Sequence, residues 1–242
     1  MPCIHKPIEA SLDRWEEVHW QIHQIECHYH DPDGIRFSFN ALIRAAKEIP
    51  QILSMELQNR EDYGDCIKPM LDKLKEDPLF ALLSRKRDYV VHRGMLEVNS
   101  SGCIGTTEGS GRWKIGFPFR VDPLESSDDA YARFVELCKA DKQVRNLMGP
   151  DCDSWPILKR KWRLPDFPQV DFLEIAVTAW HTCGTVLSDI LVHIGGNGLD
   201  LELKCVHDPD KIRSREYSSE EFFRVVDGTD IRTGEEIREP ES

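Results

Sequence analysis

The 242-residue sequence lacks a long hydrophobic run, and this absence excludes an obvious membrane protein. Its longest apolar stretch, residues 175–187, has 13 residues and is interrupted by His181, whereas a membrane helix needs roughly 18 to 20. The first seven residues also contain no apolar core of a signal peptide. We therefore expect a protein that is neither inserted into a membrane nor exported.

A surplus of positive charge is also missing. The chain has 31 Lys and Arg against 43 Asp and Glu, a net charge of -12, which excludes a protein that coats DNA or RNA through its phosphates. Its eight cysteines are scattered without a C-x-x-C pair, so we expect reduced thiols in a cytoplasmic protein. Six Trp, ten Phe and 40% hydrophobic residues are enough for a packed core and exclude a disordered chain.

The negative charge is distributed unevenly. Residues 84–120 carry seven basic and three acidic groups, and residues 216–242 carry three basic and nine acidic groups. The clearest basic segment is 84–94. The overall balance therefore permits one small cationic cleft, over which we hypothesise that the acidic C-terminal segment folds back.

Hydrophobic periodicity predicts a mainly α-helical chain with a small β element. Apolar residues recur at three- and four-residue steps in several segments, which we expect to be helices: 8–29, 35–59, 66–75, 78–94, 128–148, 170–193 and 219–226. Short strands that could pair as a hairpin are expected within 95–121, and another strand at 199–206. Four prolines predict a loop over 149–168, and Asp31-Pro32-Asp33-Gly34 predicts a turn.

A short motif lies near the end of the helix predicted over 78–94. Arg87-Asp88-Tyr89-Val90-Val91-His92 places four residues between an arginine and a histidine. This resembles the motif of HEPN domains, the nucleotide-binding domains of higher eukaryotes and prokaryotes. The resemblance implies a HEPN-like helical bundle over 1–96. Residues 97–242 would add a β insertion, two helices and an acidic C-terminal segment, with helix 170–193 completing the bundle and the whole forming one compact unit.

The resemblance implies metal-independent RNA cleavage, in which a ribose 2′-OH attacks the neighbouring phosphorus without a cofactor. His92 would move protons, because an imidazole titrates near neutral pH. Arg87 would stabilise charge on the phosphate oxygens. Asp88, four residues before His92, would support catalysis by orienting the ring. The neighbouring cations would bind RNA: Arg85, Lys86 and Arg93.

Arg87 and His92 are five residues apart, about 140° around an ideal helix. They converge on one phosphate only if the helix loosens before Gly94 or if two copies share the site. HEPN domains commonly pair, so we expect a homodimer acting on RNA as a toxin or antiviral defence effector, with an antitoxin or regulatory protein as a possible partner.

Other interpretations remain open. Arg14 with His19, and Arg85 with His92, also fit the motif; we prefer Arg87 because of the basic segment, Asp88 and the following Gly94. Alternatively, Arg87 and His92 only order the helix end of a non-catalytic HEPN-like module that binds nucleotides or proteins.

A second alternative is a metal-binding helical protein. His19, His23 and Cys27 recur every four residues on the first predicted helix and would present three ligands on one face. Further potential ligands lie nearby: Cys3, His5, His28 and His30.

Two further segments contain residue types that occur in nucleic-acid sites. Lys159–Arg163 contains Trp162, which either stacks on a base or is buried beneath a surface loop; we favour the loop. The glycine-rich segment 100–111 lacks the lysine of a phosphate-binding loop and is expected to form a hairpin loop.

Overall fold

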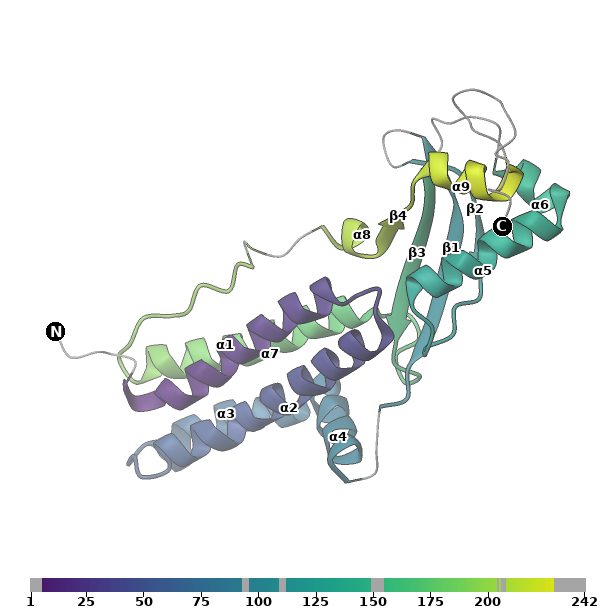
Figure 1. The fold of residues 1–242 in the computed structure, drawn as a ribbon. Helices are drawn as coiled ribbons and strands as arrows, with labels where there is room; N and C mark the ends of the chain where they lie inside the picture. Colours follow the sequence, from purple (N-terminus) through teal and green to yellow (C-terminus); the bar gives the residue numbers. More distant parts are fainter. Residues whose placement is uncertain are drawn as a thin grey trace, which may run out of the picture. The chain divides into compact units, whose positions relative to one another are not determined.

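The computed structural model of the protein describes residues 6–92, 96–108, 112–148, 155–203, 205 and 208–228. It shows a mainly helical chain with a small four-stranded antiparallel sheet (Figure 1). The chain divides into two compact units, which we call the helical unit (1–28, 33–97 and 164–207) and the sheet unit (29–32, 98–163 and 208–242). Each unit buries apolar side chains of its own, and the expectation of one compact unit stays a prediction.

The described residues of the helical unit form the helices α1 (Glu9–Cys27), α2 (Pro32–Leu57), α3 (Lys68–Glu76), α4 (Pro78–His92) and α7 (Phe172–His193). A 3₁₀ turn (Lys6–Ile8) and a π-helical turn (Tyr63–Ile67) precede α1 and α3. α1 and α7 lie side by side (Figure 1), with the rings of Trp15 and Trp180 stacked at 4.7 Å. The α2 residue Phe39 stacks on Phe172 at 3.9 Å. α7 thus belongs to the bundle, although it follows the sheet in sequence.

α7 spans 22 residues within the helix predicted over 170–193, and its apolar character extends beyond the 13-residue stretch 175–187. Within the part of the chain that the structure describes, it is the one helix that could cross a membrane by length and composition. His181 interrupts the apolar stretch 175–187, whereas the mean hydropathy over 18 residues of the helix tolerates that residue. Of this window, 56% is buried inside the protein, and a buried core helix meets the same criterion.

The sheet unit orders its strands β2-β1-β3-β4, all antiparallel. Their bounds are β1 Asn99–Glu108, β2 Arg112–Phe119, β3 Trp155–Arg163 and β4 Ser214–Glu216. Its helices are α5 (Ser127–Ala140), α6 (Lys142–Leu147), α8 (Pro209–Ile212) and α9 (Ser219–Asp227). Phe134 of α5 and Phe222 of α9 are buried with Ile104 and Leu158 of the sheet in one apolar core. The predicted hairpin is confirmed by β1 and β2.

Several local predictions are wrong. Residues 155–163 form β3 instead of a loop, because Pro156 lies at the start of the strand and interrupts little of its pairing. Residues 199–203 and 205 form no strand. α2 already begins at Pro32, within the predicted turn. The helix predicted over 128–148 breaks at Asp141, whose carboxylate accepts a hydrogen bond from the backbone N–H of Gln143 at 2.8 Å and caps α6.

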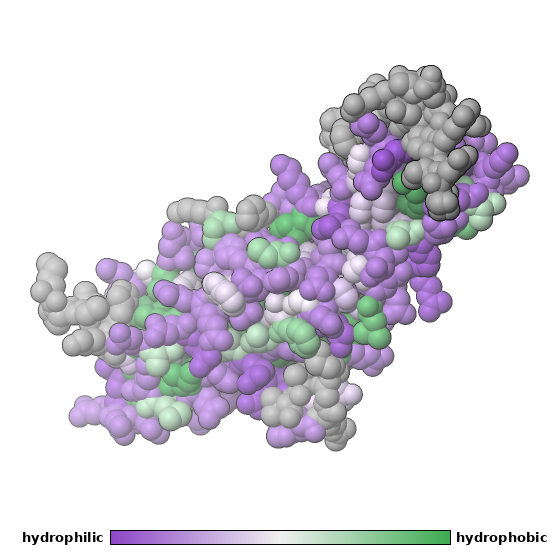
Figure 2. Space-filling view, viewed as in Figure 1, coloured by the Kyte–Doolittle hydropathy of each residue, from purple (hydrophilic) through white to green (hydrophobic). Residues whose placement is uncertain are grey.

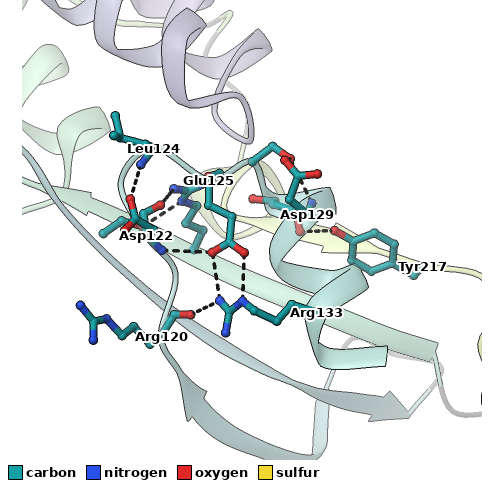
Figure 3. Close-up of polar contacts among 11 residues, drawn as sticks. Arg120, Asp122, Leu124, Glu125, Asp129, Arg133 and Tyr217 are labelled. Atoms are coloured by element: carbon teal, nitrogen blue, oxygen red, sulfur yellow. Dashed lines mark hydrogen bonds and ion pairs between the residues drawn. The ribbon is translucent and has the colours of Figure 1, made fainter. Parts of the chain in front are cut away.

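A buried arginine explains the polar turn beside the sheet. Arg160 of β3 is 0% exposed, and its guanidinium donates to the backbone oxygens of Asp122 at 2.9 Å and Glu125 at 2.7 Å, and to Ser100 Oγ at 2.9 Å. Burial lowers the pKa of Arg160 to about 10. Figure 3 shows the same turn, where the Glu125 carboxylate also pairs with Arg133 at 2.9 and 3.0 Å. The turn is therefore fixed by two arginines.

Candidate functional site

α4 carries the sequence-predicted catalytic residues, and its start is well defined. The Asp77 carboxylate accepts a hydrogen bond from the backbone N–H of Phe80 at 2.7 Å, and Pro78 occupies the first helical position, where a proline costs the helix nothing. Phe80, Leu82 and Leu83 are buried. This apolar side anchors α4 in the helical unit and leaves Arg85, Asp88, Tyr89 and His92 exposed.

The cations of α4 are partly neutralised by carboxylates. Lys86 pairs with Asp166. The Arg87 Nη1 lies 3.3 Å from the Asp88 carboxylate, and the buried Nε of Arg87 has no hydrogen-bond partner within the described residues. Arg85 is exposed on the same helix. Arg93 lies outside the described residues, so its predicted RNA contact is not located.

Asp88 has a different partner from the one expected. Its carboxylate accepts a hydrogen bond from Lys47 Nζ of α2 at 2.6 Å, and Lys47 also donates to the backbone oxygen of Ser84 at 3.2 Å. These hydrogen bonds from Lys47 and Arg87 lower the pKa of Asp88. Asp88 thus links α4 to α2, and this contact competes with the predicted role of orienting His92.

His92 is the last residue of α4 and is exposed. The helix is continuous from Pro78 to His92, so it does not loosen between Arg87 and His92. In this geometry the two side chains leave the helix about 140° apart. A site in which Arg87 and His92 act on the same phosphate therefore requires a second copy of the chain, the alternative to a loosened helix end.

A second cluster of chemically active side chains lies on α1. His19, His23 and Cys205 place their ligand atoms within 4.8 Å of one another, and His19 Nε2 lies 3.0 Å from Cys205 Sγ. Burial, with His23 close by, lowers the pKa of His19 and favours its neutral ring. The two histidines are four residues apart, which places them on adjacent turns of one helix face.

The alternative metal site is therefore only partly correct. Cys27 is exposed and is not part of the cluster, because eight residues of α-helix separate its Cα from that of His19 by about 12 Å. Cys205 takes its place from a segment 186 residues away in sequence, and no local spacing indicates this. His30 is bonded to Ser127 Oγ and to the backbone oxygen of Ile212, in the sheet unit. Cys3 and His5 lie outside the described residues.

A cavity of about 430 Å³ opens beside this cluster. Its lining includes both histidines, the stacked pair Trp15 and Trp180, and three carboxylate residues: Glu16, Asp200 and Glu202. The ring of Trp180 lies 5.7 Å from that of His19. The indole Nε1 of Trp180 is buried without a hydrogen-bond partner among the described residues. The cavity thus combines aromatic walls, acidic groups and metal-binding side chains.

The possible base-stacking residue on β3 is excluded. Trp162 is 0% exposed, and its indole N–H donates to the backbone oxygen of Tyr29 at 2.8 Å. The Arg160 guanidinium lies over its ring, 3.8 Å from the centroid. The burial expected for Trp162 is confirmed, but it lies in a strand and not beneath a loop. The basic residue Arg160 of this strand therefore lies in the core of the sheet unit and not on its surface.

Among the described residues, the exposed apolar side chains on the face drawn in Figure 2 form no large continuous patch. In the view of Figure 2 hydrophilic residues predominate, and apolar residues lie as separate spots among them. Isolated exposed apolar side chains are normal on water-exposed surfaces. The two clusters on α4 and α1 are thus the strongest functional candidates among the described residues.

The described residues define a mainly helical protein with a four-stranded antiparallel sheet. Residues 4–105 match the model of a family described as Bacteriophage lambda protein ea47. This range is less than half of the chain; it includes α1 to α4, and so His19, His23 and the segment 87–92, but excludes Cys205. No curated protein and no solved structure matches the chain.

Proposed function

We propose that the protein is a metal-independent endoribonuclease of HEPN type, acting as a homodimer in the manner of a toxin or defence effector. The observation that carries the proposal is the end of α4, where Arg87 and the exposed His92 lie in a basic segment on a helix anchored by its apolar side. Arg85 and Lys86 extend the positive charge along the same helix. This is the pair of groups that ribose 2′-OH attack requires: a proton carrier and a phosphate-binding cation.

The dimer follows from the continuous helix. Because one α4 directs Arg87 and His92 apart, Arg87 of one copy acts with His92 of the other. A two-fold axis then creates two equivalent sites, in which each copy supplies one residue to each site. Asp88 contributes by holding α4 on α2 through Lys47, and its partial neutralisation of Arg87 limits non-specific binding of RNA.

The first experiment measures cleavage of a structured RNA in EDTA by the wild type and by Arg87→Ala and His92→Ala. We expect both variants to lose activity, His92→Ala by about 10²- to 10⁴-fold, the usual contribution of a general acid or base. Arg14→Ala is the matched control, because it alters the other Arg-x4-His pair on α1 and leaves the histidines of that helix unchanged. Equal cleavage by the wild type, Arg87→Ala and His92→Ala excludes this site.

A mixing experiment tests the shared site. Arg87→Ala and His92→Ala proteins, unfolded together and refolded, form heterodimers in which one site keeps both wild-type residues. Activity should return to about a quarter of the wild-type value, since half of the dimers are mixed and each has one of two sites intact. If each copy forms a complete site by itself, no activity returns.

The alternative is a HEPN-like interaction module without catalysis. The observation in its favour is the contact of Asp88 with Lys47 and Arg87, which orders the end of α4 without any substrate. In this case no variant and no wild-type preparation cleaves RNA, while Lys47→Met weakens dimer formation or nucleotide binding.

A further inference from the structure

We propose that His19, His23 and Cys205 bind a zinc ion in the helical unit. The proposal goes beyond the ribonuclease and does not depend on it, because these residues are separate from Arg87 and His92 in sequence and in role. It combines a histidine pair on α1 with a cysteine that follows α7 by twelve residues.

The geometry is close to that of a zinc site. Zn–N bonds of about 2.0 to 2.1 Å and a Zn–S bond of about 2.3 Å place tetrahedral ligand atoms roughly 3.5 Å apart. Here His19 Nε2 and Cys205 Sγ are 3.0 Å apart, and all three ligand atoms lie within 4.8 Å. Small side-chain rotations therefore bring the three atoms onto one ion.

An outer carboxylate orients one of the ligands. His23 Nδ1 lies 2.8 Å from the Glu26 carboxylate, which fixes the ring so that Nε2 is the nitrogen available to a metal. Zinc-binding histidines typically make such a contact with their other ring nitrogen. Glu26 is one turn further along α1, and its side chain is only 4% exposed, so this contact is well shielded from water.

The donor set selects zinc over the common hard cations. Two imidazoles and a thiolate suit Zn²⁺, whereas Mg²⁺ and Ca²⁺ prefer oxygen ligands. The adjoining cavity carries Glu16, Asp200 and Glu202, whose negative charge favours a divalent ion. With three protein ligands, the fourth position of a tetrahedral ion is open to water in this cavity.

The bound ion would fasten an irregular segment to the bundle. Residues 194–203 and 205 contain no helix or strand, and among their polar contacts are the Leu199 backbone N–H to Ser188 Oγ and the Gly196 N–H to the Leu191 oxygen. A metal that links Cys205 to α1 closes a long loop of the chain, and such a link stabilises the folded state.

The test begins with zinc content of the full-length protein. The metal-free protein, prepared with a chelator, is titrated with Zn²⁺ by calorimetry, and bound zinc is measured after dialysis. We expect one zinc per chain in the wild type and in Cys27→Ser, the matched control for the ligand predicted from sequence. His19→Ala, His23→Ala and Cys205→Ser should lose at least tenfold in affinity, and Glu26→Gln about 10- to 100-fold.

Cobalt distinguishes a specific metal site from metal that is bound loosely at the surface. Co²⁺ added to the metal-free wild type and to Cys27→Ser should give a thiolate-to-metal charge-transfer band, which Cys205→Ser should lack. Zinc should also protect Cys205 from alkylation by iodoacetamide. This readout uses the wild-type protein alone and remains valid if a variant fails to fold.

Wild-type protein that retains no zinc after dialysis overturns the proposal. So does a Cys205→Ser protein that binds zinc like the wild type, or equal alkylation of Cys205 with and without zinc. Because RNA cleavage is measured separately in EDTA, a failed zinc site and a failed ribonuclease give different results.

Discussion

Lys47 Nζ on α2 lies 2.6 Å from the Asp88 carboxylate on α4, one residue after Arg87. This contact separates two roles that the sequence places together on α4: Asp88 holds the helix in the bundle, while Arg87 and His92 carry the proposed chemistry.

Asp88→Asn should reduce RNA cleavage far less than the roughly 10²- to 10⁴-fold loss expected for His92→Ala. An asparagine still accepts a hydrogen bond from Lys47, and the carboxylate is engaged with Lys47 and Arg87. Single-turnover cleavage rates of both variants at one pH provide the comparison. An Asp88→Asn protein as inactive as His92→Ala would restore Asp88 as the residue that orients the ring.

Arg160→Met should lower the free energy of unfolding of the sheet unit by about 1 to 3 kcal/mol, the usual cost of leaving buried polar groups without a hydrogen-bond partner. The substitution leaves the backbone oxygens of Asp122 and Glu125 without their donors. Lys161→Met is the matched control, since the neighbouring side chain is exposed and a surface change costs within about 0.5 kcal/mol. Urea unfolding followed by circular dichroism measures both; equal stabilities would show that the guanidinium does not hold the turn.

His30 should make the sheet unit less stable in mild acid. Burial lowers its pKa to about 4, with Arg215 and Arg160 also disfavouring the charged ring. The unfolded chain, with a pKa near 6.5, binds the proton first as the pH falls. The contribution of the neutral His30 ring to the free energy of unfolding is therefore fully present above about pH 6.5. It declines by up to about 3 kcal/mol as the pH falls towards 4.

Replacing this histidine tests the cause of the decline. His30→Gln keeps a polar group near Ser127 Oγ and the Ile212 oxygen but cannot titrate. Its stability should be lower at pH 7 and should change less between pH 7 and pH 4, as measured by urea unfolding at several pH values. An unchanged slope would assign the acid sensitivity to other groups.

Gly184→Ala should destabilise the helical unit by about 1 to 3 kcal/mol, the usual cost of overpacking a core. A Cβ at this position would lie 2.7 Å from Leu201 Cδ2 and 2.8 Å from Trp15 Cζ2, and Trp15 is held by its stack on Trp180. Gly64→Ala serves as the control, because its Cβ meets nothing within 4 Å. The midpoint temperature of thermal unfolding should be lower for Gly184→Ala than for Gly64→Ala. Equal midpoints would mean that the Trp15 side chain moves aside without cost.

The sequence predicted the helices well because their apolar residues follow the helical period over long segments, as in α1, α2 and α7. β3 was missed because its buried face contains Arg160 between Leu158 and Trp162, so the alternation of apolar residues that marks a strand is interrupted by a charge. Such a residue is tolerated only because the turn at 122–125 supplies its acceptors, which is a contact between distant segments.

The two candidate sites differ in the same way. Arg87 and His92 are only five residues apart in sequence, so a local motif was enough to select them. Cys205 was not selected, because only the folded chain brings it to His19. The histidine pair was recognised by its spacing, whereas its third member was misassigned to Cys27, on the same helix but two turns away.

The alternation of the two units along the chain has a practical consequence. The polypeptide passes from one unit to the other after residues 28, 32, 97, 163 and 207, so neither unit is a continuous piece of sequence. A fragment cut after residue 105, where the family match ends, would contain α1 to α4 but lose α7, together with Trp180 and Phe172. Expression of the two halves as separate proteins would therefore give an open bundle and an incomplete sheet, and biochemical work requires the undivided chain.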